Sequence, residues 1–165
     1  MNVLFLDYDG VVNTPMWQLS SKGEMRCSYN FPRDNKVNNF QACQWVSEFC
    51  EKHNYCIVVT STWRLNDNYI DCLKNGGLRN CVNVIGRTPY IPNGNKREAE
   101  IREYLNSHQD IENYIIIDDE NDIIGGLKNH LISCDPNVGF GMTKFFETER
   151  LHEKINNEVV FSGKI

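Results

Sequence analysis

The sequence lacks any long apolar run, and no stretch approaches the roughly 18 apolar residues that a membrane-spanning helix requires. It also lacks a basic, apolar leader, because the chain enters a predicted strand at Val3. We therefore expect a cytoplasmic protein without a membrane partner. Hydrophobic residues make up 41% and charged residues 24% of the 165 residues, which is typical of one globular domain spanning residues 1–165 and not of a disordered chain.

No two cysteines have the C-x-x-C spacing of zinc sites and thiol redox motifs, which argues against a zinc site. The cysteines are odd in number and scattered along the chain. Without a secretion signal we expect free thiols, several of them in the core, and no disulfide-linked partner. The seven are Cys27, Cys43, Cys50, Cys56, Cys72, Cys81 and Cys134.

An excess of positive charge is missing too, since 17 Lys and Arg face 22 Asp and Glu and give a formal net charge of -5. Proteins that coat long nucleic acids must neutralise many phosphates, so the composition argues against such a protein. It leaves open a protein that binds a single phosphorylated end.

Apolar runs alternate with segments of helical spacing along the chain. Uninterrupted apolar runs are typical of parallel strands that are covered on both faces. The pattern predicts a three-layer, Rossmann-like α/β fold with a mostly parallel central sheet. The strand-like runs span residues 3–6, 55–60, 82–85, 114–117 and 131–134, an edge strand is predicted at 159–161, and the helices are predicted at 37–53, 67–75, 96–108 and 143–156.

The first strand runs into Asp7-Tyr8-Asp9-Gly10. Side chains alternate along an extended chain, so the two acids face roughly the same way, and Gly10 permits a sharp turn after them. Ligands of open α/β sheets bind at the carboxyl ends of the strands, where these acids lie. The acid pair is therefore placed for chemistry on a ligand.

Three other clusters follow the same logic. The second strand ends in the hydroxyl cluster Thr60-Ser61-Thr62, followed by Trp63, which we expect to pack, and by Arg64. Lys96 and Arg97 begin a predicted helix, where cations oppose the helix dipole and thus hint at a nearby anion. The strand at 114–117 ends in the acids Asp118 and Asp119.

The order of acid pair, hydroxyl, cation and second acid pair resembles the four motifs of the haloacid dehalogenase (HAD) superfamily of phosphotransferases, over almost the whole chain. The strings at residues 60–64, 85–89 and 97–101 are also similar to the small HAD domains of RNA repair proteins and polynucleotide kinase-phosphatases. The resemblance implies a HAD fold with a minimal cap and a hydrolase of the phosphatase type, a Mg²⁺-dependent phosphomonoesterase.

The resemblance also implies roles for the acids. Asp7 would attack phosphorus and form an aspartyl phosphate, which splits hydrolysis into two easier steps. Asp9 would act as general acid and then as general base. Mg²⁺ would be held by Asp7, by the carbonyl oxygen of Asp9, and by Asp118 or Asp119.

The remaining motif residues would bind the substrate. A hydroxyl from Thr60 or Ser61 and a cation from Lys96 or Arg97 would stabilise the transferred phosphoryl group, and both choices stay open. Arg64 is a candidate for contact with a second substrate phosphate.

Residues 13–35 are predicted to form an inserted flap or minimal cap that leaves the crevice open to large substrates. Its aromatic residues, with nearby cations, are suited to stacking a base, although they could equally pack the loop onto the domain. A nucleotide or a phosphorylated nucleic acid end is therefore the expected substrate. The alternatives are a phosphate-binding regulatory module without turnover and a phosphatase of small metabolites. The aromatic residues and cations of this predicted flap are Trp17, Lys22, Arg26, Tyr29, Phe31 and Arg33.

Overall fold

The computed structural model describes residues 1–17, 39–92, 96–120 and 125–162, with only the backbone at residues 96 and 158–162. Five parallel strands form one sheet in the order β3-β2-β1-β4-β5. The first strand lies at the centre, and the chain fills one half of the sheet and then the other. The strands are β1 (Asn2–Leu6), β2 (Tyr55–Val59), β3 (Val84–Arg87), β4 (Asn113–Asp118) and β5 (Leu131–Ser133).

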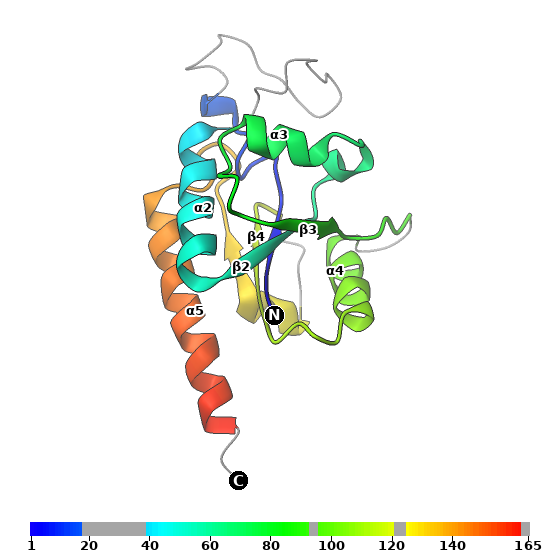
Figure 1. Ribbon diagram of the computed structural model, residues 1–165, viewed down its shortest axis with the longest axis vertical. Helices are drawn as coiled ribbons and strands as arrows, with labels where there is room; N and C mark the ends of the chain where they lie inside the picture. The colour runs from blue at the N-terminus through cyan, green and yellow to red at the C-terminus, as the bar shows by residue number, and fades with distance from the viewer. Residues whose placement is uncertain (18–38, 93–95, 121–124, 163–165) are drawn as a thin grey trace.

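Helices cover both faces of the sheet and make the three-layer α/β fold that the sequence predicts. Figure 1 shows α2 and α5 together on one side and α4 on the other. Continuous apolar strands fit this arrangement, because Leu4 and Leu6 belong to the core beneath α2 and α5, whereas Val3 and Phe5 pack in the core beneath α4. The helices are α2 (Phe40–His53), η1 (Thr62–Leu65), α3 (Tyr69–Asn75), α4 (Lys96–Ser107), η2 (Gly125–His130) and α5 (Met142–Ser162).

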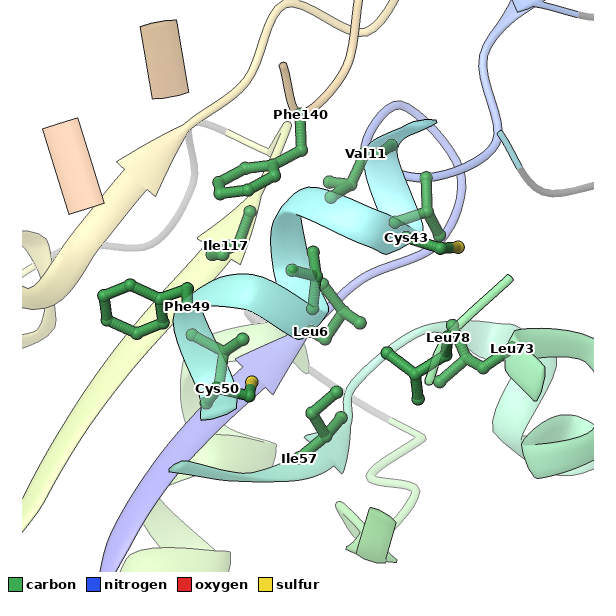
Figure 2. Close-up of a cluster of buried hydrophobic side chains, with 14 of the residues drawn as sticks. Leu6, Val11, Cys43, Phe49, Cys50, Ile57, Leu73, Leu78, Ile117 and Phe140 are labelled. Carbon is green, nitrogen blue, oxygen red and sulfur yellow. The ribbon is translucent and has the colours of Figure 1, made fainter. Parts of the chain in front are cut away.

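The larger core cluster joins the sheet to α2. Figure 2 shows Ile117 of β4 between Phe49 of α2 and Phe140 from the segment before α5, with Leu6 of β1 in the same cluster. All four side chains are at most 2% exposed. Burial of this kind fixes the central strands relative to one another, and with them the residues at which they end.

The strand register aligns the predicted site residues. Leu6 pairs with Val59 on one side and with Ile117 on the other, so that the residues following them lie side by side. The Asp7 N–H donates to the carbonyl oxygen of Ile117 at 3.1 Å, and the N–H of Thr60 donates to the carbonyl oxygen of Leu6 at 3.0 Å. Asp7 is thus flanked by Thr60 and by the end of β4.

Several predicted boundaries and one predicted strand are wrong. The helix predicted from residue 37 begins at Phe40, after its N-cap Asn39. The helix predicted from residue 67 begins at Tyr69, because η1 occupies the preceding residues and Asn66 closes it by donating its N–H to the carbonyl oxygen of Trp63. The strand predicted at 82–85 begins at Val84 and continues to Arg87. The edge strand predicted at 159–161 is part of α5, because each residue added to an existing helix gains a hydrogen bond without the cost of nucleation.

The other predictions for the whole chain concern its cysteines, the insertion, the domain organisation and membrane-spanning helices. None of the six cysteines within the described ranges forms a disulfide, as predicted, and four are buried. Cys27 and residues 18–35 of the predicted insertion lie outside the described residues, and the single-domain organisation stays a prediction. Among the helices that the structure describes, none combines the length and apolar character needed to cross a membrane.

Candidate active site

A tight loop after β1 brings the first acid pair against the second. The carbonyl oxygen of Tyr8 accepts hydrogen bonds from the N–H groups of Val12 at 2.9 Å and Asn13 at 2.7 Å. Gly10 has a φ of 76°, and a Cβ atom there would lie 2.4 Å from Cγ of Asp119. Only glycine both adopts this conformation without strain and leaves room for the acid.

Three carboxylates meet at this edge of the sheet. Asp7, Asp118 and Asp119 each offer an oxygen within 4.8 Å of the others, and the first two are buried. Carboxylate oxygens are the ligands that Mg²⁺ prefers in proteins. The cluster therefore fits a hard divalent cation. Both Asp118 and Asp119 belong to it, so the choice between them stays open.

The electrostatics of the acids point the same way. Burial, together with the charges of Asp119 and Asp9, raises the pKa of Asp7 from 3.8 to about 6 in spite of the lowering effect of Arg97. Burial and the charge of Asp7 raise the pKa of Asp118 well above its usual value. Ionised together, these carboxylates repel one another in a poorly solvated place, and a bound cation would offset that repulsion.

The guanidinium of Arg97 lies among the acids. Its Nη1 is 3.2 Å from Oδ1 of Asp7, its Nε is 3.3 Å from Oδ2 of Asp118, and its Nη2 is 3.6 Å from Oε1 of Glu120. Burial opposes the charge, but Asp7 and Asp118 together raise the pKa of Arg97 above its usual range. Of the two candidate cations, Arg97 reaches the site, while the side chain of Lys96 lies outside the described part.

Among the described residues, the buried Oγ1 of Thr60 has no hydrogen-bond partner. Nη1 of Arg97 and Oδ2 of Asp118 also make no hydrogen bond there, although both lie at ion-pair distance, from Asp7 and from Nε of Arg97. Buried polar atoms are almost always bonded, so this group is suited to accept a ligand. The hydroxyl oxygen of Ser61 instead accepts the N–H of Trp63 at 3.4 Å, where it caps η1. Of the two candidate hydroxyls, that of Thr60 is therefore the one available to a ligand.

Arg64 lies beneath the crevice. It is 2% exposed, its Nη2 pairs with Oε1 of Glu100 at 2.7 Å, and its Nε donates to the carbonyl oxygen of Thr88 at 3.0 Å. Its Nη1 donates to the carbonyl oxygens of Thr60 and Ser61. Its guanidinium holds the ends of β2 and β3 together. Arg64 also lines the groove beside the site, so its contact with a second substrate phosphate stays a prediction.

Asp9 is held by two side chains that the sequence analysis did not assign to the site. Nε1 of Trp63 donates to Oδ2 of Asp9 at 2.9 Å, and Nδ2 of Asn13 donates to Oδ1. Trp63 was expected only to pack. Its position directly after the hydroxyl cluster is a signal that could have suggested a closer link to the chemistry.

The protein is an α/β domain with a parallel sheet. Acids, a hydroxyl and a guanidinium lie at the carboxyl edge of that sheet, where α/β enzymes bind their ligands. Residues 3–145 match the family model described as the HAD domain in Swiss Army Knife RNA repair proteins. The chain therefore belongs to this HAD family, which confirms the resemblance and supports a hydrolase of the HAD type.

Two further comparisons complete the picture. No curated protein matches the chain. Among solved structures, a haloacid dehalogenase-like family hydrolase from Streptococcus pneumoniae is similar, with 14% sequence identity, 90% of each chain covered and a TM-score of 0.48.

Proposed function

We propose that the protein is a Mg²⁺-dependent phosphomonoesterase that works through an aspartyl phosphate on Asp7. The observation that carries the proposal is the placement of Asp7 between Thr60 and Asp118, at ion-pair distance from Arg97. Phosphoryl transfer needs mainly positioning and charge stabilisation, which such a constellation supplies.

In the proposed reaction a carboxylate oxygen of Asp7 attacks phosphorus, and the bond from phosphorus to the leaving oxygen breaks. Asp9 donates a proton to that oxygen. In the second half, Asp9 takes a proton from a water molecule that attacks phosphorus, which releases phosphate and restores Asp7. The hydroxyl of Thr60 and the guanidinium of Arg97 bind the phosphoryl oxygens throughout.

Asp7, the carbonyl oxygen of Asp9, and Asp118 or Asp119 would hold the metal. When bound, Mg²⁺ offsets the negative charges of the attacking carboxylate and the phosphate. The fit is supported by the clustered carboxylate oxygens and by Oδ2 of Asp118, which is buried and has the ion pair with Arg97 but no hydrogen bond among the described residues.

The proposed substrate is a nucleotide or a phosphorylated nucleic acid end. A groove of about 510 Å³ beside the site supports it, with Arg87, Thr88, Tyr90 and His108 among its lining residues. Arg87 is exposed and pairs in register with Val59, one residue before Thr60, so it lies one strand away from the proposed phosphate site.

The chemistry of this groove suits a second nucleotide unit. Arg87 offers a cation for a further phosphate, Tyr90 offers a ring that is 54% exposed, and Thr88 has a buried hydroxyl oxygen without a hydrogen-bond partner among the described residues. The family description names RNA repair, which is consistent with such a substrate. Of the aromatic flap residues, Tyr29 and Phe31 lie outside the described part, so their stacking role stays a prediction.

The first experiment measures hydrolysis of an aryl phosphate with Mg²⁺ and with EDTA. Activity should require Mg²⁺ and vanish in Asp7→Asn, because an amide cannot serve as the attacking carboxylate. Asp9→Asn should lose about 10² to 10⁴-fold. The exposed Asp67→Asn is the matched control and should behave as the wild type. Full activity of Asp7→Asn would refute the mechanism, and Mg²⁺-dependent phosphate binding without turnover by the wild type would favour a regulatory module.

The second experiment compares kcat/KM for a 3′-phosphorylated oligonucleotide, a nucleoside monophosphate and a hexose phosphate. We expect the oligonucleotide to be preferred, and Arg87→Gln and Trp17→Ala each to reduce that preference while the aryl phosphate is hydrolysed as before. The exposed Arg150→Gln is the matched charge control. Preference for the hexose phosphate would instead indicate a phosphatase of small metabolites.

A further inference from the structure

The indole of Trp63 is fixed against Asp9 from several directions. Its side chain is 1% exposed, its ring lies 5.7 Å from the ring of Tyr8, and its backbone N–H and carbonyl oxygen are bonded to Ser61 and Asn66. From this position Nε1 donates to Oδ2 of Asp9 at 2.9 Å. A buried, large and rigid side chain thus ends in one polar contact with the proposed acid.

The two donors to Asp9 differ in chemistry. An indole N–H can only donate a hydrogen bond, so the oxygen that faces Trp63 always acts as an acceptor. The amide of Asn13, which faces Oδ1, carries both a donor and an acceptor. In this structure Nδ2 of Asn13 donates to Oδ1, but a turn of the amide would let its oxygen face a protonated Oδ1, whereas the indole can face only an accepting oxygen. The oxygen of Asp9 favoured to carry the proton is therefore Oδ1.

We propose that Trp63 is a positioning residue for Asp9: its indole N–H holds Oδ2 as an acceptor, so that Oδ1 is the oxygen that exchanges the proton during phosphoryl transfer. This inference rests on the proposed function and adds a residue to it. A Trp side chain is suited to the task because its size fixes the donor in place, whereas a flexible donor would follow the carboxylate as it rotates.

A carboxylate oxygen of Asp7 forms a bond to phosphorus, the bond from phosphorus to the leaving oxygen breaks, and the electron pair stays on that oxygen. The leaving oxygen takes the proton from Oδ1 of Asp9, which becomes a carboxylate that accepts from Trp63 and Asn13. In the second half, a water oxygen forms a bond to phosphorus as the bond from phosphorus to the Asp7 oxygen breaks. Phosphate leaves, the electron pair stays on the Asp7 carboxylate, and a proton of the water passes to Oδ1.

The test uses the leaving group. Trp63→Phe keeps most of the ring and removes the donor, and incorporation of benzothienylalanine at residue 63 replaces the N–H by sulfur with nearly the same shape. Substrates are an alkyl phosphate, whose leaving oxygen needs a proton, and p-nitrophenyl phosphate, whose leaving group is stable as an anion. We measure kcat/KM, because it reports the steps up to formation of the phosphoenzyme.

Both variants should lose at least about tenfold in kcat/KM for the alkyl phosphate, a part of the 10² to 10⁴-fold effect of general acid catalysis, and less than about threefold for p-nitrophenyl phosphate. Trp45→Phe is the matched control, since that ring is half-buried against Phe145 on α5. Its kinetics should match the wild type with both substrates.

Other outcomes overturn the inference. Equal losses with the two substrates, or no loss with either in the benzothienylalanine protein, would show that Trp63 serves packing alone. Thermal melting of each variant identifies a loss that stems from misfolding, and the isosteric variant keeps the test valid if Trp63→Phe does not fold. If the wild type hydrolyses neither substrate, the proposed function fails, which is distinct from these results.

Discussion

Replacing Asp7 by Asn should stabilise the metal-free protein while removing the proposed activity. Asp7 is 4% exposed, and burial together with Asp119 and Asp9 raises the pKa of its carboxyl from 3.8 to about 6 in spite of Arg97. A carboxylate with a raised pKa destabilises the folded state when it is ionised. Asn keeps the shape of the side chain without the charge.

The size of the effect follows from the shift in pKa. Each unit corresponds to 1.36 kcal/mol, so a rise of about 2 units corresponds to about 3 kcal/mol at neutral pH. The folded state holds the proton more tightly than the unfolded chain, so the wild type loses stability as pH rises from 3.8 to about 6. The advantage of Asp7→Asn should therefore be small below pH 4 and complete above about pH 7.

The assay is urea unfolding of wild type and Asp7→Asn at pH 4 and pH 7.5 in EDTA, repeated at pH 7.5 with Mg²⁺. Mg²⁺ that binds only the folded wild type adds about 2.7 kcal/mol to its free energy of unfolding when the Mg²⁺ concentration is a hundred times Kd. The stability advantage of Asp7→Asn should therefore shrink or reverse. The exposed Asp67→Asn controls for a change of net charge. A variant less stable than the wild type at pH 7.5 in EDTA, or an advantage of equal size at both pH values, would refute this view of the site.

Two further predictions concern the metal and the support of the site. Beryllium fluoride with Mg²⁺ should raise the Tm of the wild type by mass action, and the shift should disappear in Asp118→Ala or Asp119→Ala, whichever residue holds the metal; normal shifts in both variants would contradict the metal site. Glu100→Gln should cost about 3–5 kcal/mol in urea unfolding, because it leaves the buried Arg64 without its ion pair, whereas the exposed Glu103→Gln should change stability little.

The sheet could be predicted because its signal is carried by composition over several residues. Each central strand carries a continuous apolar run, at residues 3–6, 55–59 and 114–117, and the structure packs side chains of these runs on both faces of the sheet. The edge strand β3 alternates between half-buried and exposed residues, which gives a weaker signal, and its predicted start was two residues early. Local patterns also favoured a strand at residues 159–161, where helix continuation decides the outcome.

The placement of the site residues shows where sequence reasoning stops. Proximity of Asp7, Thr60 and Asp118 follows from parallel strands alone, because their carboxyl ends share one edge. The burial of Arg64 does not follow from the strand order, because it depends on an ion pair with Glu100 of α4, which lies 36 positions further along the chain. The indole of Trp63 likewise meets Asp9 only once η1 turns the chain back toward β1. Residues at strand ends can thus be assigned from their order, whereas those that orient them require the tertiary contacts.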